Sequence, residues 1–315
     1  MTRILVPSLV RRRMDVVVVG SMGYDAISTP KGSGEDLLGG SATYAGIAAS
    51  FAAPKVGVVG VVGHDFKAED RDLLEARGID LTGLMQGDGS TFRWWGSYEG
   101  TMDEATTLRT DLNVLGSFDP KVPETYRHPS VLLCANLHPL VQASVLEQVT
   151  ARRLTMLDSM NLWIELANDD LLNVLGRVDI VVLNDAEVRS LGTRGSTAAA
   201  AVVVKGMLRP DATLIVKRGE HGAYVLHPTG PMVVPAVPSP GLVDPTGCGD
   251  SFAGTIAAEL AKGTGPVGRA ELRSALEHAS VVASFTLETV GVSGLLDMDV
   301  HAKAARLQDL QRLSA

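Results

Sequence analysis

Cysteine, aromatic residues and long apolar runs are all scarce in this 315-residue chain. Cys134 and Cys248 are its only cysteines. Two cysteines are too few for a disulfide framework or a cysteine zinc site, so we expect a reducing, cytoplasmic location. No stretch approaches the ~20 consecutive apolar residues that a membrane-spanning helix needs. We therefore expect no contact with a membrane.

Positive charge is limited as well. Lysine and arginine number 28 against 36 aspartate and glutamate residues, and the formal net charge is −8. General nucleic-acid binding needs a basic surface, so we expect no nucleic-acid partner. Aliphatic residues and glycine are abundant instead, because hydrophobic residues make up 45% of the chain, aromatic residues only 4%, and there are 33 glycines. This composition is typical of an α/β enzyme.

The N-terminal segment superficially resembles an export signal. Three arginines at residues 11–13 precede the four valines of residues 16–19. The apolar run stops at Gly20, short of the ~7–15 apolar residues of such a signal, so it predicts a first buried strand. We expect residues 1–13 to form a loosely ordered extension and residues 14–315 to form the folded domain.

Short apolar runs bounded by glycine, aspartate or asparagine alternate with helix-like patterns along the chain. The runs predict strands at residues 15–20, 55–62, 130–134, 153–157, 180–183, 213–216 and 223–227. The patterns predict helices at residues 42–52, 65–77, 141–150, 163–175 and 186–191, and a helical C-terminal third at residues 254–262, 269–287 and 300–313. This alternation implies a mostly parallel sheet that is covered by helices on both faces.

One region does not follow this alternation of strands and helices. Two runs with alternating apolar residues, 91–98 and 106–110, are joined by a turn-like Glu-Gly pair and predict a β-hairpin with aromatic faces. A hairpin is marginal alone, so it must pair with other strands or with a second subunit. Trp94 and Trp95 alternate along the run, so only one of them can point into a cleft.

Residues 241–255 carry the clearest chemical signal. A glycine-dense, acidic turn runs directly into a helical pattern that starts near Gly247 or Gly249. The first N–H groups of a helix have no intrahelical partner and carry the positive end of the dipole, so they form an anion site. Asp250 at the mouth of this site is better placed to accept a proton, which favours phosphoryl transfer to a hydroxyl group. The alternative is that Asp250 is only a helix N-cap.

Two motifs resemble those of the ribokinase-like (PfkB) carbohydrate kinases. The family signature, usually Asp-Thr-x-Gly-Ala-Gly-Asp, is similar to Asp244-Pro245-Thr246-Gly247-Cys248-Gly249-Asp250. The N-terminal Gly-Gly motif of the family is similar to Gly39-Gly40-Ser41-Ala42-Thr43-Tyr44-Ala45-Gly46. The resemblance implies a ribokinase-like three-layer α/β/α fold with a central, mostly parallel sheet. It also implies a small β-sheet lid formed by about residues 21–38 and 88–117.

The resemblance further implies a set of substrate-binding residues. Asp25 matches the aspartate that hydrogen-bonds sugar hydroxyls in the family, and Gly39 and Gly40 match the glycines that bring backbone amides against the substrate. Tyr44 stands where many members have asparagine, which changes what the pocket can hold. The other residues expected to face the acceptor substrate are Trp95, Arg109 and Asn136, together with Arg93, Asp158, Asn161 and Trp163.

The nucleotide and the metal are expected at the next strands. Asn184 and Glu187 are similar to the family's Asn-x-x-Glu motif, which organises Mg²⁺, its waters and the phosphates. The plain alternative is a capping box, and both readings can be true at once. The resemblance implies that the remaining nucleotide-binding residues are Lys217, Gly219, Gly222, Thr246, His278 and Val282.

The sequence thus predicts an ATP-dependent sugar kinase that transfers the γ-phosphoryl group of Mg²⁺-ATP to a hydroxymethyl group of a sugar or sugar-like substrate. Asp250 is the predicted base, and the N–H groups of Gly247, Cys248 and Gly249 stabilise the transferred group. The alternatives are a nucleoside kinase of the adenosine, inosine or cytidine type and, with less support, a nucleotide-binding protein without catalysis. The resemblance leaves open a monovalent cation such as K⁺ near Asp244, and a homodimer through the lid.

Overall fold

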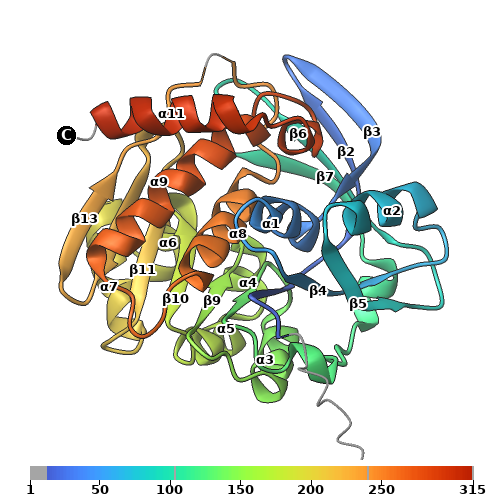
Figure 1. The fold of residues 1–315 in the computed structure, drawn as a ribbon, viewed down its shortest axis with the longest axis horizontal. Helices are drawn as coiled ribbons and strands as arrows, with labels where there is room; N and C mark the ends of the chain where they lie inside the picture. The colour runs from blue at the N-terminus through green and yellow to red at the C-terminus, as the bar shows by residue number, and fades with distance from the viewer. Residues whose placement is uncertain (1–12, 103, 240, 314–315) are drawn as a thin grey trace, which may run out of the picture.

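Two β-sheets form the framework of the molecule (Figure 1). The structure is a computed structural model that describes residues 13–102, 104–239 and 241–313, so residues 1–12 of the predicted extension lie outside the described residues. Its strands are β1 (Val16–Val19), β2 (Gly23–Thr29), β3 (Gly32–Gly39), β4 (Val56–Val62), β5 (Ile79–Gln86), β6 (Phe92–Tyr98), β7 (Ala105–Asp111), β8 (Val131–Cys134), β9 (Leu154–Asp158), β10 (Ile180–Asn184), β11 (Thr213–Lys217), β12 (Ala223–His227) and β13 (Gly230–Val234).

The larger sheet has the strand order β13-β12-β11-β10-β9-β8-β1-β4-β5. Its strands from β5 to β11 pair in parallel, and only β12 and β13 run antiparallel to their neighbours. β1 shows why the predicted core strands are buried. Val16 and Val18 join the apolar cluster on one face of the sheet, whereas Val17 and Val19 join the cluster on the other face. Both faces are covered, so a continuous valine run is stable here.

Helices cover both faces of this sheet (Figure 1). They are α1 (Ser41–Ser50), α2 (Ala68–Ala76), α3 (Pro139–Gln148), α4 (Asn161–Leu166), α5 (Asn168–Leu175), α6 (Asp185–Gly192), α7 (Thr197–Met207), α8 (Cys248–Ala261), α9 (Arg269–Thr286), α10 (Ser293–Leu296) and α11 (Val300–Leu313). Helices α1, α8 and α9 share one apolar cluster, and α3, α5, α6 and α7 share the other. Among the described residues, no helix is both long and apolar enough to cross a membrane.

The smaller sheet has the order β3-β2-β6-β7 and lies beside the larger one (Figure 1). The predicted hairpin is confirmed as β6 and β7, which pair antiparallel. It does not stand alone, because β6 also pairs in parallel with β2. This small sheet is the predicted lid, and we use that name for it below.

The structure corrects several predicted boundaries. The single helix predicted at residues 163–175 is two helices, α4 and α5, separated at Ala167. Helix α8 begins at Cys248, which confirms the predicted helix start near Gly247 or Gly249 and extends the helical range of 254–262 back into the signature motif. The sequence-based assignment missed β5, β13 and helix α7.

Candidate active site

Three neighbouring parallel strands end in polar residues at the same edge of the large sheet. β9 ends in Asp158, β10 in Asn184 and β11 in Lys217. Open α/β sheets bind their ligands at the carboxyl ends of the strands. The predicted nucleotide and metal residues therefore meet where a ligand site is expected.

The first turn of α8 supplies free backbone donors at this edge. Gly247 is the N-cap and has a φ of 75°, in the left-handed region that glycine adopts without strain. The Cys248 N–H donates to the Pro245 carbonyl at 3.2 Å, but the N–H groups of Gly247 and Gly249 have no acceptor among the described residues. Unpaired N–H groups at a helix start fit an anion such as a phosphate.

Asp250 lies in the first turn of α8, three residues after the N-cap. Because Gly247 holds the N-cap position, the alternative that Asp250 is the N-cap is wrong. Burial and the nearby charge of Asp158 together raise the pKa of Asp250 to about 7, although Lys217 opposes the shift. A carboxyl group with a pKa close to neutral is suited to general base catalysis.

Lys217 and Asp158 form a buried ion pair next to this turn. The Lys217 Nζ lies 3.1 Å from Oδ1 and 3.0 Å from Oδ2 of Asp158. A Cβ atom placed on Gly249 would lie only 2.9 Å from the same Nζ. The ammonium group is therefore held against the first turn of α8.

Asn184 and Glu187 form the predicted capping box at the start of α6. The Asn184 backbone N–H donates to Glu187 Oε2 at 2.7 Å, and its side-chain amide donates to Oε1 at 2.8 Å. Burial raises the pKa of Glu187 to about 7, and Lys217 opposes the shift. In the described part of the chain no three His, Cys, Asp or Glu residues cluster as direct metal ligands. Glu187 thus fits Mg²⁺ mainly through the waters that this ion retains.

Asp25 lies beside the two glycines of the Gly-Gly motif. A Cβ atom on Gly39 would lie 2.0 Å from Asp25 Oδ2, and the Gly40 N–H contacts the carboxyl group. Burial raises the pKa of Asp25 to about 8, with contributions from Asp244 and Asp250. The structure therefore brings Asp25, Gly39 and Gly40 together with the predicted base.

Tyr44 lies under the signature turn. Its ring would be 2.3 Å from a Cβ atom on Gly247, and only 1% of the residue is exposed. The buried Tyr44 hydroxyl has no hydrogen-bond partner within the described residues. The ring supports the turn, and the predicted substrate contact of Tyr44 is restricted to this hydroxyl group.

The two faces of the lid correct one sequence-based prediction. Across the parallel strands β2 and β6, Asp25 pairs with Trp94, and Ala26 pairs with Trp95. Paired residues point to the same face and successive residues to opposite faces. Tyr98, on the same face of β6 as Trp94, contacts Thr246 of the signature turn, so Trp94 lies on the inner face of the lid and Trp95 on the outer face.

Arg109 is corrected for the same reason. It pairs with Trp95 across β6 and β7, and its guanidinium carbon lies 4.7 Å from the centre of the Trp95 ring. The side chain of Arg109 is 64% exposed. Trp95 and Arg109 therefore do not face the reacting groups.

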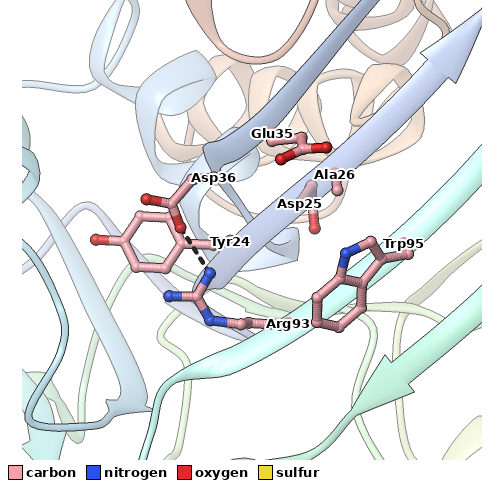
Figure 2. A pocket seen from close by; sticks show the side chains of 7 residues that line it. All are labelled: Tyr24, Asp25, Ala26, Glu35, Asp36, Arg93 and Trp95. Atoms are coloured by element: carbon pink, nitrogen blue, oxygen red, sulfur yellow. Dashed lines mark hydrogen bonds and ion pairs between the residues drawn. The ribbon is translucent and has the colours of Figure 1, made fainter.

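A cavity of about 280 Å³ lies on this outer face (Figure 2). It is lined by Tyr24, Asp25, Ala26, Glu35, Asp36, Arg93 and Trp95. Arg93 is engaged by Asp36 at 2.6 Å and by Asp65 at 3.3 Å. Asp25 borders the cavity from β2, and the charges of Asp244 and Asp250 contribute to its raised pKa. The cavity therefore shares Asp25 with the site around Asp250, but its other lining residues lie outside that site.

Comparison with known proteins agrees with this geometry. The model of the pfkB family carbohydrate kinases matches residues 13–298. The chain belongs to this family. It is therefore a phosphotransferase with an alcohol group as acceptor, and more narrowly a sugar or nucleoside kinase.

The relatives of this pfkB family kinase include enzymes for both substrate classes. A cytidine kinase of Thermococcus kodakarensis is 28% identical over 257 residues, which cover 79% of this chain and 90% of that protein. Among solved structures, a Burkholderia thailandensis nucleoside kinase in complex with ADP-inosine has a TM-score of 0.76 at 17% identity and covers 94% and 95% of the two chains. A ribokinase of Cryptococcus neoformans in complex with ADP has a TM-score of 0.72 at 20% identity, with 93% and 99% covered. At these identities the two structures show the fold alone.

Two inner-face residues of this pfkB family kinase were missed by the sequence-based prediction. The Trp94 ring lies over Gly96 of β6, because a Cβ atom on Gly96 would be only 2.0 Å from it. The Thr246 hydroxyl donates to the Tyr98 hydroxyl oxygen at 3.1 Å, so the lid contacts the signature turn. Alternation along the strand groups Trp94 with Tyr98, but it does not say which face is the inner one.

His278, one of the two predicted adenine contacts on α9, lies far from the site. His278 Nδ1 lies 3.4 Å from Glu259 Oε1, near the C-terminal end of α8. Glu259 follows Cys248 by three helical turns, roughly 16 Å along the axis. Val282 is fully buried in the apolar core. His278 is therefore not placed for the predicted adenine contact, whereas the predicted adenine contact of Val282 stays a prediction.

The other predicted positions have local partners. Asn136 accepts from Trp163 Nε1 at 2.9 Å and donates to the Met160 sulfur at 3.0 Å, so its amide group is already engaged. Gly222, with a φ of 75°, closes the turn after β11, where the Arg218 N–H donates to its carbonyl at 2.8 Å. Gly219 has a φ of 51° and open space around it. A nucleotide-binding role for Gly219 and Gly222 stays a prediction.

Asp244, at the predicted monovalent-cation position, accepts hydrogen bonds that hold the signature turn. One carboxylate oxygen of Asp244 accepts the Thr246 N–H at 2.9 Å, and the other accepts the Gly291 N–H at 3.0 Å. Asp244 is fully buried. These bonds fix the shape of the signature turn, and a K⁺ ion at this position stays a prediction.

Proposed function

We propose that this pfkB family kinase transfers the γ-phosphoryl group of ATP to the 5′-hydroxyl group of a nucleoside. The observation that supports this substrate class is the pairing of Asp25 with Trp94 on the inner face of the lid. Asp25 accepts hydrogen bonds from ribose hydroxyls, and the half-buried Trp94 ring provides a flat surface for a base. Stacking of a nucleobase on an aromatic side chain is worth about 1–3 kcal/mol.

The sequence favoured a sugar as the acceptor and gave a nucleoside as the alternative, whereas this proposal favours the nucleoside. A simple sugar would use Asp25 but would leave the Trp94 ring without a planar partner. The names of the Thermococcus kodakarensis and Burkholderia thailandensis relatives also support a nucleoside. The shared chemistry, phosphorylation of a hydroxymethyl group, is the same for both substrate classes.

Asp250 is the proposed general base of the reaction. Its carboxylate accepts the proton of the attacking 5′-hydroxyl group while the oxygen of that group attacks the γ-phosphorus atom. The bond between the γ-phosphorus and the β,γ-bridging oxygen breaks, and ADP leaves. The unpaired N–H groups of Gly247 and Gly249 stabilise the negative charge on the phosphoryl oxygens, and the Lys217 ammonium adds a positive charge beside them. Asp25 holds the acceptor in place.

Mg²⁺ would be held near Glu187 and Asn184. Each oxygen of Glu187 accepts one hydrogen bond from Asn184 and retains a lone pair for a metal-bound water. When bound, Mg²⁺ neutralises charge on the phosphate oxygens. The capping box gives Glu187 a fixed orientation, so the structural role and the metal role are compatible.

A substrate panel tests the proposal. ADP release would be measured with Mg²⁺-ATP and cytidine, adenosine, inosine, uridine, ribose or fructose as acceptor. We expect kcat/KM for the best nucleoside to exceed that for ribose by about a hundredfold, the combined effect of a stacked base and its polar contacts. Turnover of ribose or fructose at equal or higher kcat/KM would overturn the nucleoside assignment and leave the kinase chemistry intact.

The same substrate panel also tests the alternative that the chain binds a nucleotide without catalysis. Tight ATP binding without turnover of any acceptor would indicate a nucleotide-binding protein without catalysis. The pKa of Asp250 near neutrality and the free N–H groups beside it support catalysis. A homodimer through the lid also stays a prediction, which light scattering of the purified chain would test.

A further inference from the structure

The Asp158–Lys217 ion pair spans three strands of the central sheet. β10 lies between β9, which ends in Asp158, and β11, which ends in Lys217. Neighbouring strands are ~4.8 Å apart, so the two strands that carry the pair are about 10 Å apart. Both side chains reach across the end of β10, and they are only 4% and 18% exposed. The pair is therefore a buried contact that bridges the end of β10 at the carboxyl edge of the sheet.

The carboxyl group of Asp158 is itself held in place. Its Oδ1 accepts the Ser159 N–H at 2.9 Å, and both of its oxygens accept from Lys217. Lys217 also has Glu187 and Asp250 nearby, but it makes no hydrogen bond to either of them among the described residues. The position of the ammonium group thus depends on Asp158.

Lysine needs such a partner at this place. Its side chain is a flexible four-carbon stem with a point charge at the end, and an ammonium group in a buried position loses its hydration. An opposite charge within hydrogen-bond distance keeps it charged and fixes its direction. Here the fixed direction leads to Gly249, whose N–H group has no acceptor in the described part of the chain.

We propose that Asp158 is a positioning residue, which holds the Lys217 ammonium beside Gly249 so that it meets the β- and γ-phosphates of ATP. This inference rests on the proposed kinase function. In this proposal Asp158 acts by holding Lys217 and does not contact the acceptor substrate. The family resemblance instead implied that Asp158 faces the acceptor. It predicts that the two residues act as one unit.

A double-mutant cycle tests this. Asp158→Asn keeps the shape and removes the charge, Lys217→Met removes the ammonium group, and the third variant carries both changes. The affinities for Mg²⁺-AMP-PNP and for AMP would be measured by calorimetry, together with kcat. We expect Asp158→Asn to weaken AMP-PNP binding about tenfold, as loss of a charge-assisted contact does. AMP lacks the β- and γ-phosphates, so we expect its affinity to change less than about twofold.

The cycle distinguishes a positioning role from the alternatives. In the Lys217→Met background, we expect Asp158→Asn to change AMP-PNP affinity and kcat by less than about twofold, because partners that act as a unit are not additive. Losses that multiply would overturn the inference, since Asp158 would then act independently of Lys217. Tighter AMP-PNP binding by Asp158→Asn would also overturn it, because Asp158 would be competing with the phosphates.

The stability of each variant must be separated from its nucleotide affinity. Asp158→Asn leaves Lys217 as a buried, unpaired charge, which is strongly destabilising, whereas the double variant removes both charges. If the single variant does not fold, Lys217→Met and the double variant still form a comparison, and a further loss of AMP-PNP affinity in the double variant would overturn the inference. Recovery of both stability and AMP-PNP affinity in the double variant would indicate a structural role only. If the substrate panel shows no turnover, the kinase proposal fails, but the AMP-PNP measurements still test the role of Asp158.

Discussion

Asp25 and Trp94 are paired across the parallel strands β2 and β6 of the lid, on the face whose Tyr98 contacts Thr246 of the signature turn. This pairing places a carboxyl group that can hold ribose next to a ring that can hold a base. It also moves Trp95 and Arg109 to the opposite face. Under the nucleoside proposal, Trp94 and not Trp95 is therefore the ring on which the base stacks.

The first prediction separates the two tryptophans. We expect Trp94→Ala to raise KM for the preferred nucleoside about tenfold or more, because a stacked base is lost. Trp95→Ala is the matched control on the outer face, and we expect less than about a twofold change in KM. Initial rates of ADP release over a range of nucleoside concentrations give both values. A larger effect of Trp95→Ala would place the substrate in the cavity of Figure 2.

The second prediction concerns the base. We expect Asp250→Asn to lower kcat by about a hundredfold or more, the usual contribution of a general base, while ATP affinity stays within about twofold. Asp170→Asn is the matched control, since Asp170 is also the third residue of its helix, α5. ADP release gives kcat, and calorimetry gives the ATP affinity. Unchanged turnover of Asp250→Asn would remove the proposed mechanism.

The third prediction concerns stability against pH. The pKa of Asp25 is raised by burial, Asp244 and Asp250 from 3.8 to about 8. The folded state therefore binds the proton of the Asp25 carboxyl group more tightly than the unfolded state does. The stabilisation that this proton gives the folded state is fully present below pH 3.8 and is lost as the pH rises towards 8. We expect Asp25→Asn to raise the melting temperature by several degrees at pH 8, and by less at pH 5.

Asp65→Asn is the control for this experiment. Burial raises the pKa of Asp65, but hydrogen bonds from Thr91 and Arg93 outweigh it, and the net shift is downward. A lowered pKa stabilises the folded state at neutral pH and loses this effect in acid. We therefore expect Asp65→Asn to lower the melting temperature at pH 8. Thermal melts of both variants that shift in the same direction at pH 8 would contradict the assignment.

The fourth prediction concerns the signature turn. Gly247→Ala would place a Cβ atom 2.3 Å from the Tyr44 ring at a φ of 75°. We expect a loss of about 2 kcal/mol or more in the free energy of unfolding, from strain and overpacking together. Gly265→Ala is the control, because Gly265 has a φ of 72° and no atom within 4 Å of the added Cβ. Urea unfolding measures both, and equal losses would show that the contact with Tyr44 has no effect.

Local patterns in the sequence were sufficient for much of the fold. The buried strands β1 and β4 are continuous β-branched runs, and the glycines of the signature motif mark the start of α8. These features depend on residues that are close together in the chain. Boundaries were less certain where a pattern continues past a break, as at Ala167 between α4 and α5.

The site residues divide in the same way. Asp250, Gly247 and Gly249 were predicted because a helix start and its first turn are local. His278 was misplaced because periodicity gives the face of a helix but not the neighbour of that face, which here is Glu259. The pairing of Lys217 with Asp158 was not predicted, since it depends on the order β9-β10-β11.

The sequence by itself determined the alternation of strands and helices, the anion-binding start of α8 and the carboxyl group beside it, because these follow from hydrogen bonding and periodicity within a few residues. Only the tertiary structure decided that Trp94 and not Trp95 faces Asp25, and that Asp158 holds Lys217 at Gly249. Both depend on strand order and register. A shift of one residue in register turns every side chain of a strand to the other face, and no local pattern fixes that choice.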